Sequence, residues 1–186
     1  MKNLFFKTII TTSISFEKKN LNVVKDFIRI FPCSKFFKRK KYKIRQIISY
    51  CKIKKIENLI VLVKKGDQIF LWQIDLKTGF ITAYKIVSLI LSLNIDKSGK
   101  ETKHTPELIF RNFKGKIGLT ISSMIRKLFP GYPNFKGRQV ITFYFRKKLI
   151  FSRFHRYLFS SSGKDVKIQE LGPRITIKFI GIFFYK

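Results

Sequence analysis

Residues 137–159, GRQVITFYFRKKLIFSRFHRYLF, and residues 174–179, RITIKF, decide the fold of this chain. Aromatic and β-branched side chains dominate the first run, which is typical of strands. Val140–Arg146 and Leu149–Phe159 are expected to pair across the short basic break at Lys147-Lys148. In RITIKF, basic or polar residues alternate with apolar ones, which predicts a half-buried strand with one basic face.

Upstream of these strands, the sequence predicts a helix and a polar connection. Apolar residues recur at helical spacing from Ile117 to Leu128, and Pro130 ends the pattern. GYPNFKG (131–137) is rich in turn formers and is expected to form a loop. Asn94–Thr105 is polar and is expected to link two halves of the chain, the second of which begins at Pro106.

The front half reads as β-α-β-α-β followed by a meander. Two helices are expected, one from Leu21 to a stop at Pro32 and one over Tyr42–Lys54, and a basic segment rich in aromatic residues, KFFKRKK (35–41), lies between them. The expected strands are Leu4–Thr12, Leu59–Val63, Gln68–Asp75 and Phe80–Val87.

The composition indicates a folded, strongly cationic protein. The chain has 186 residues, with 40 Lys and Arg against 10 acidic residues, a net charge of +30 and a pI of about 10.4. With 45% hydrophobic and 16% aromatic residues it is too apolar for a disordered basic tail. Such a charge favours a polyanionic partner, nucleic acid above all, or an anionic membrane surface. An AT-rich genome, whose codons favour Lys, Ile and Phe, would also raise the charge.

Motifs of catalysis and cofactor binding are absent from the sequence. It contains no phosphate-binding loop, dinucleotide fingerprint, nucleophile elbow or metalloprotease motif, and its acids are scattered singly. Cys33 and Cys51 fit no zinc pattern. The longest apolar run, Ile86–Leu93, is too short for a membrane span. The stripe of residues 42–54 is narrow for a membrane-surface helix. We therefore expect no enzyme activity, no metal, no cofactor and no small-molecule substrate.

The segment from Gly137 to Lys178 carries the candidate RNA-binding residues. Alternation along its strands can place aromatic side chains inward and a basic row outward, where guanidinium groups pair with phosphates. The alternative is an ordinary solvated face, and His155 fits a core position as well as a base contact. The candidates are Arg138, Arg146, Lys147, Lys148, Arg153, His155, Arg156, Arg174 and Lys178.

Several motifs in one order and spacing resemble the Brix-domain family. GRQV (137–140), FSRFHRY (151–157) and ELGPR (170–174) carry the resemblance in the second half. KTIITTS (7–13), FPCSKFFKRK (31–40) and IENLIVLV (56–63) carry it in the first. The resemblance implies one Brix domain over 1–186, with an N-terminal half of about 1–93, a linker of about 94–105 and a C-terminal half of about 106–186. The implied fold class is α/β, and each of the two similar halves is expected to be a mixed β-sheet packed with α-helices.

The resemblance also implies a function. Brix-domain proteins act in the nucleolus as non-catalytic assembly factors that bind precursor ribosomal RNA of the large subunit together with other pre-ribosomal factors. The nucleolus could also be that of a reduced endosymbiont nucleus. The family's polar His-Asn turn is replaced here by Tyr144–Lys148, so a contact made by that pair is not expected. The alternative is a structural rRNA-binding protein of a reduced or organellar ribosome.

Overall fold

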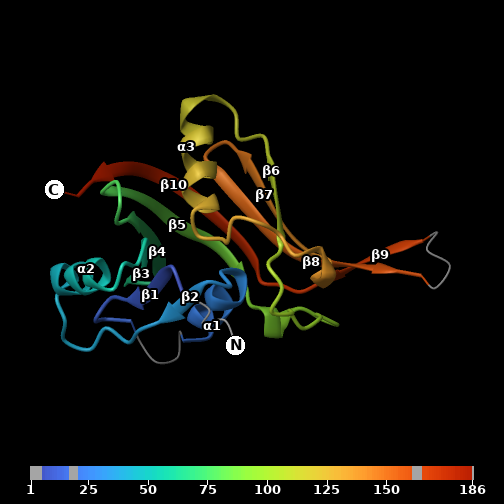
Figure 1. Ribbon diagram of the computed structural model, residues 1–186, viewed down its shortest axis with the longest axis horizontal. Helices are drawn as coiled ribbons and strands as arrows, with labels where there is room; N and C mark the ends of the chain where they lie inside the picture. The colour runs from blue at the N-terminus through green and yellow to red at the C-terminus, as the bar shows by residue number, and fades with distance from the viewer. Residues whose placement is uncertain (1–5, 17–20, 161–164, 186) are drawn as a thin grey trace.

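The computed structural model describes residues 6–16, 21–160 and 165–185, which form one curved sheet with helices on both faces (Figure 1). The strands are β1 (Thr8–Thr12), β2 (Ser34–Phe36), β3 (Asn58–Lys65), β4 (Gln68–Asp75), β5 (Phe80–Ile90), β6 (Glu107–Arg111), β7 (Gln139–Arg146), β8 (Leu149–Phe159), β9 (Val166–Glu170) and β10 (Arg174–Phe184). The helices are α1 (Leu21–Ile30), α2 (Ile44–Ile53) and α3 (Gly115–Arg126), and two 3-10 turns are η2 (Ser92–Asn94) and η3 (Phe135–Gly137).

Two similar halves are joined edge to edge in this sheet. The strand order is β2-β1-β3-β4-β5-β10-β8-β7-β6, and β9 pairs with β8 beside the end of β10. In the first half β1 is parallel to β3, and β4 and β5 follow as antiparallel neighbours. In the second half β6, β7, β8 and β10 repeat that arrangement. The antiparallel pair of β5 and β10 joins the halves, so the two expected sheets form a single sheet.

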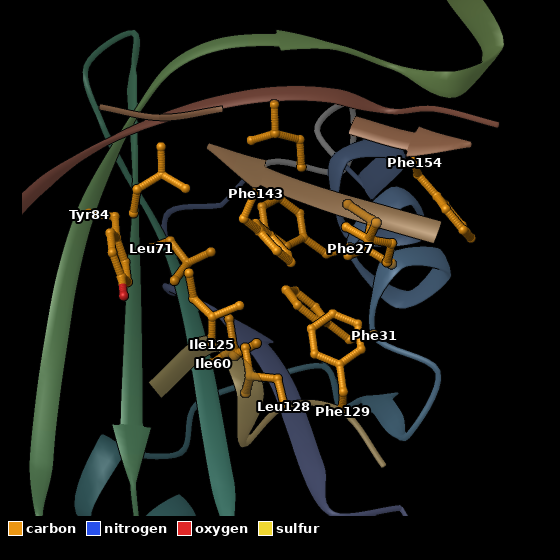
Figure 2. Close-up of a cluster of buried hydrophobic side chains, with 14 of the residues drawn as sticks. Phe27, Phe31, Ile60, Leu71, Tyr84, Ile125, Leu128, Phe129, Phe143 and Phe154 are labelled. Carbon is orange, nitrogen blue, oxygen red and sulfur yellow. The ribbon is translucent and has the colours of Figure 1, made fainter. Parts of the chain in front are cut away.

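One face of the sheet is covered by α1 and α3 and holds the main core. Phe27 of α1 and Ile125 of α3 belong to one buried cluster with Leu71, Phe143 and Phe154 from strands of both halves (Figure 2). The cluster forms because these strands put every second side chain on the same face. A single core therefore spans both halves.

Among the described residues, the one helix on the other face is α2, which covers the first half. Ile48 and Cys51 of α2 pack against Ile9, Leu59 and Ile74 from β1, β3 and β4. In Figure 1 α2 lies at the opposite end of the molecule from β8 and β9, which project as a hairpin. β1 and the first five residues of β3 are thus buried on both faces, as the all-apolar run Leu59–Val63 predicts.

Most expected elements are confirmed, with shifted ends. Residues 1–5 and 17–20 lie outside the described residues, and they include the first two residues, 4 and 5, of the expected first strand. Two strands were not anticipated, β6 and β9, and each is five residues long. β6 is short and lies at the sheet edge, and β9 alternates weakly, so neither has a strong periodic signal.

The segment expected as a linker, 94–105, is irregular but held in place by bonds to both halves. Arg29 of α1 pairs with Glu101 at 2.6 Å. Gln139 of β7 accepts a hydrogen bond from the Thr102 backbone N–H and donates one to the His104 carbonyl. The Gly99 N–H donates to the Glu170 carbonyl at 2.8 Å. Within the described ranges, no helix is long and apolar enough to cross a membrane.

Candidate nucleic-acid interface

The face of the second half opposite α1 and α3 carries most of the candidate residues. We call it the open face. Among the described residues, no helix packs on the side chains of this face to form a buried cluster. Its residues follow from the registers of β7, β8 and β10 with β5. The open face consists of Thr142, Tyr144, Arg146, Leu149, Phe151, Arg153, His155, Arg174, Thr176, Lys178 and the adjoining Lys85 of β5.

Cations form a row across the open face. Arg146 pairs with Leu149, Leu149 pairs with Lys178, and Lys178 pairs with Lys85, so the row crosses four strands. Arg146 and Lys178 are exposed and Lys85 is half-buried. Lys178 and Lys85 are directly opposite each other on neighbouring strands, about 5 Å apart at Cβ, so their charges repel, whereas Leu149 separates Arg146 from Lys178. A polyanion such as a nucleic-acid backbone relieves the repulsion between these cations.

Two aromatic rings lie beside this cation row. Tyr144 of β7 and Phe151 of β8 are cross-strand partners, with ring centroids 6.1 Å apart and ring planes tilted by 32°. The Tyr144 side chain is 37% exposed, and Phe151 is half-buried. The expectation that the aromatic side chains point into the core is confirmed for Phe143 and Phe154 but is wrong for Tyr144. Exposed rings between cations offer unpaired bases a stacking surface.

A second group of polar residues lies where β8 meets β9. Arg174 donates two hydrogen bonds to the carboxylate of Glu170, at 2.8 and 2.7 Å, and this pairing lowers the pKa of Glu170. Glu170 is the β9 partner of His155. Burial lowers the pKa of His155, with Arg153 and Arg174 lowering it further against the opposing effect of Glu170. The imidazole is therefore neutral at pH 7 and adds a hydrogen-bonding group but no charge.

The hairpin turn between β7 and β8 extends the cation row at its tip. Lys147 and Lys148 form a two-residue loop, and both have positive φ, 48° and 63°. Such turns favour Asn and Gly, since other side chains are strained in the left-handed region. Both lysines are exposed beside Arg146. The structure thus brings three consecutive cations together at this turn, as the sequence predicted.

Two candidate residues lie away from the open face. Arg156 falls on the same side of β8 as Phe154, opposite Arg153, and its guanidinium donates to the Lys100 carbonyl in the 94–105 segment. The expectation that Arg153 and Arg156 share one basic row is therefore wrong, because residues separated by an odd number of positions face opposite sides of a strand. Arg138 precedes β7, and its guanidinium lies 4.9 Å from the Phe159 ring centroid.

Sequence reasoning missed two cations near this surface. Lys85 of β5 belongs to the first half and reaches the open face only through the pairing of β5 with β10. Arg111 ends β6 and pairs with Tyr144, next to Phe151. The signal for Arg111 was its alternation in ELIFR, a run too short to predict a strand. Lys85 had no local signal, because its position depends on a contact between distant strands.

The described residues show neither a metal-binding cluster nor a reactive thiol. They contain no group of three or more His, Cys, Asp or Glu residues that could hold a metal ion. Cys33 and Cys51 are free, and burial raises the pKa of Cys51 to about 11 and also raises that of Cys33, so both thiols stay protonated at pH 7. The arrangement is suited to binding an anion along the sheet.

Comparison with known proteins places the chain in a family. The model of the Brix domain matches residues 13–181. The chain belongs to the Brix-domain family. Ribosome production factor 1 of Rattus norvegicus is 37% identical over 176 residues, which cover 92% of this chain and 50% of that protein. The Saccharomyces cerevisiae protein of that name is 32% identical over 174 residues, covering 92% of this chain and 59% of its own. This Brix domain therefore spans about half the length of the curated relatives it matches.

Solved structures share the Brix fold at low sequence identity. A probable ribosomal biogenesis protein from Aeropyrum pernix superposes with a TM-score of 0.64 at 12% identity, covering 93% of this chain and 96% of the archaeal one. Mil, an archaeal Imp4-like protein, gives a TM-score of 0.52 at 11% identity and covers 96% and 99%. The α/β fold of two similar halves is thus confirmed.

Proposed function

We propose that this Brix-domain chain is a non-catalytic ribosome-biogenesis factor that binds precursor ribosomal RNA through its open face. The observation that carries the proposal is the pairing of Tyr144 and Phe151 beside a row of cations on the side of the sheet that α1 and α3 leave free. Phosphate contacts supply affinity, and bases unstacked from the RNA are held on the rings.

The names of the relatives support the cellular role. Proteins called ribosome production factor 1 match 92% of this chain in rat and yeast. In our proposal the RNA partner is precursor RNA of the large subunit, the protein acts in the nucleolus, and other pre-ribosomal factors bind alongside. The net charge of +30 supports a large polyanionic partner.

Crosslinking in cells tests the proposal directly. The tagged chain is crosslinked to RNA, and the attached fragments are sequenced. We expect fragments of precursor ribosomal RNA, including spacer sequences that mature ribosomes lack. A variant with Arg153→Glu and Lys178→Glu should lose these fragments, while Lys25→Glu and Lys116→Glu on the helix-covered side should keep them. Equal recovery by both variants contradicts the role of the open face.

Sedimentation separates assembly from a structural ribosomal role. An assembly factor is found in precursor particles and is absent from mature subunits. A structural protein of a reduced or organellar ribosome remains with mature subunits. Finding the chain in mature ribosomes would replace the proposed role with that second function.

A further inference from the structure

A pocket in the first half lies on the other side of α2 from the open face. It is about 400 Å³ in volume, within the range of roughly 300–1,000 Å³ that small-molecule sites occupy. It opens between β1, the segment after the edge strand β2, and α2. Its lining residues are Ile9, Thr11, Phe37, Lys38, Arg39, Tyr42, Gln46, Ile47 and Tyr50.

Aromatic and apolar groups dominate the interior of this pocket. The rings of Phe37 and Tyr50 lie 6.2 Å apart at an angle of 57°, and Ile9 and Ile47 add aliphatic surface. Tyr42 is 55% exposed and Tyr50 43% exposed, although both rings line a cavity. Large rings that border a pocket offer a flat ligand apolar surface to pack against.

The polar groups of the pocket are few and directional. The Thr11 hydroxyl donates to the Phe37 carbonyl at 2.8 Å, which leaves its oxygen to accept from a ligand. The amide oxygen of Gln46 accepts the Lys43 N–H at 2.8 Å, so only its amide nitrogen is left to donate. One donor and one acceptor near aromatic walls match the edge of a nucleobase.

The charged residues that line the pocket, and those next to them in the sequence, are basic. Between Asp26 and Glu57 the sequence holds no acidic residue, and residues 35–45 contain seven Lys and Arg. Lys38 and Arg39 line the pocket itself. The Arg39 Nε–H donates to the Tyr42 carbonyl at 3.0 Å, which fixes this guanidinium close to the opening. An occupant with an apolar flat body and negative charge at its edge satisfies both the interior and the rim.

We propose that this pocket binds one unpaired nucleotide of single-stranded RNA, with the base packed against the rings of Tyr42 and Tyr50 and the adjoining phosphates on Lys38 and Arg39. The inference rests on the proposed RNA binding and adds a second site to it. The base enters from an unpaired stretch, because the bases of a duplex are stacked and closed to such a pocket. The pocket and the open face then hold two separate points of one RNA.

The test compares two probes on the full chain: a single-stranded RNA of roughly 10 nucleotides and the same backbone without bases. Tyr42→Ala and Tyr50→Ala should each weaken binding of the intact RNA by about tenfold, the loss that follows from removing one base-stacking contact. Neither should change binding of the abasic probe. Lys38→Gln with Arg39→Gln should weaken both probes, because those side chains contact phosphate.

A control variant outside the pocket and a variant that fills the pocket complete the test. Tyr132→Ala removes a tyrosine that is 88% exposed in the second half, and it should leave both probes unaffected. Gln46→Trp should fill the opening and reproduce the Tyr42→Ala loss while all cations stay. A photoreactive thiouridine in the RNA should crosslink to peptides containing Tyr42 or Tyr50. Because Tyr42 is the more exposed of the two, its variant remains informative if Tyr50→Ala fails to fold.

The outcomes separate this inference from the proposed function. If the wild-type chain binds neither probe, both proposals fail. If it binds RNA and loses affinity through changes on the open face, but Tyr42→Ala and Gln46→Trp bind as the wild type does, the nucleotide pocket alone is overturned. That second result would mean that the pocket makes no contact with the RNA.

Discussion

Removing three cations from the open face should change the salt dependence of RNA binding by a calculable amount. Arg146, Arg153 and Lys178 lie on adjacent strands of this face, and each can reach one phosphate. In single-stranded RNA each neutralised phosphate adds about 0.7 to the slope of log K against log salt concentration. Replacing all three residues by Gln should therefore reduce the slope by about 2.

The slope difference translates into affinity. Raising the salt concentration from roughly 50 to 200 mM is a fourfold change. With a slope smaller by about 2, the fold-loss of affinity over this range should be about 15 times smaller in the variant than in the wild type. Fluorescence anisotropy of a labelled single-stranded RNA, titrated at several salt concentrations, measures this directly. Thermal unfolding of the variant should match the wild type, because these side chains lie outside the main buried cluster.

The matched control removes the same charge from the other side of the sheet. Lys25 of α1 and Lys114 and Lys116 at the start of α3 are exposed, and their replacement by Gln lowers the net charge equally. We expect the slope to stay within about 0.5 of the wild type, since distant surface charges are screened. Equal slope changes in both triple variants would refute the reasoning, because binding would then depend on total charge and not on the open face.

Four further predictions follow from individual residues. Tyr144→Ala should weaken binding of single-stranded RNA by about 1–3 kcal/mol and leave duplex RNA unaffected in the same assay. Phe154→Ala should lower the free energy of unfolding by about 3–5 kcal/mol, measured in urea, because Phe154 is 2% exposed in the shared core. Replacing Lys147 by Asn and Lys148 by Gly should raise the free energy of unfolding by about 1 kcal/mol while weakening RNA binding, since both positions have positive φ. Burial opposes ionisation of Asp75, but hydrogen bonds from Lys127 and neighbouring groups outweigh it and hold its pKa below the ordinary value. The contribution of ionised Asp75 to the free energy of unfolding is therefore complete above the unfolded pKa of about 3.9 and is lost as pH falls through the folded pKa. Asp75→Asn should reduce the dependence of the free energy of unfolding on pH in this acid range, measured by urea titrations at several pH values.

The local elements of the fold followed from sequence patterns. Apolar residues at helical spacing predicted α1, α2 and α3, and the alternation in RITIKF predicted β10. The short edge strand β6 and the strand β9 were not predicted, because each has too few residues for a clear periodic pattern.

The candidate site was predicted only in part. The run of cations at Arg146–Lys148 and the basic face of β10 are where the sequence indicated. Arg156 faces the other side, and Lys85 joins from the first half through β5. Neighbours in the sequence alternate between faces, so a list of nearby cations always mixes two surfaces.

The sequence by itself determined the charge, the order of helices and strands, and which residues share a side of each strand. It also carried the motifs, GRQV, FSRFHRY and ELGPR, by which the family was recognised. Only the tertiary structure decided that β5 joins β10 in one sheet, that α2 covers the first half alone, and that a pocket opens beside it. The reason is physical: alternation follows from local backbone geometry, whereas the choice of which face is covered depends on packing between segments far apart in the chain.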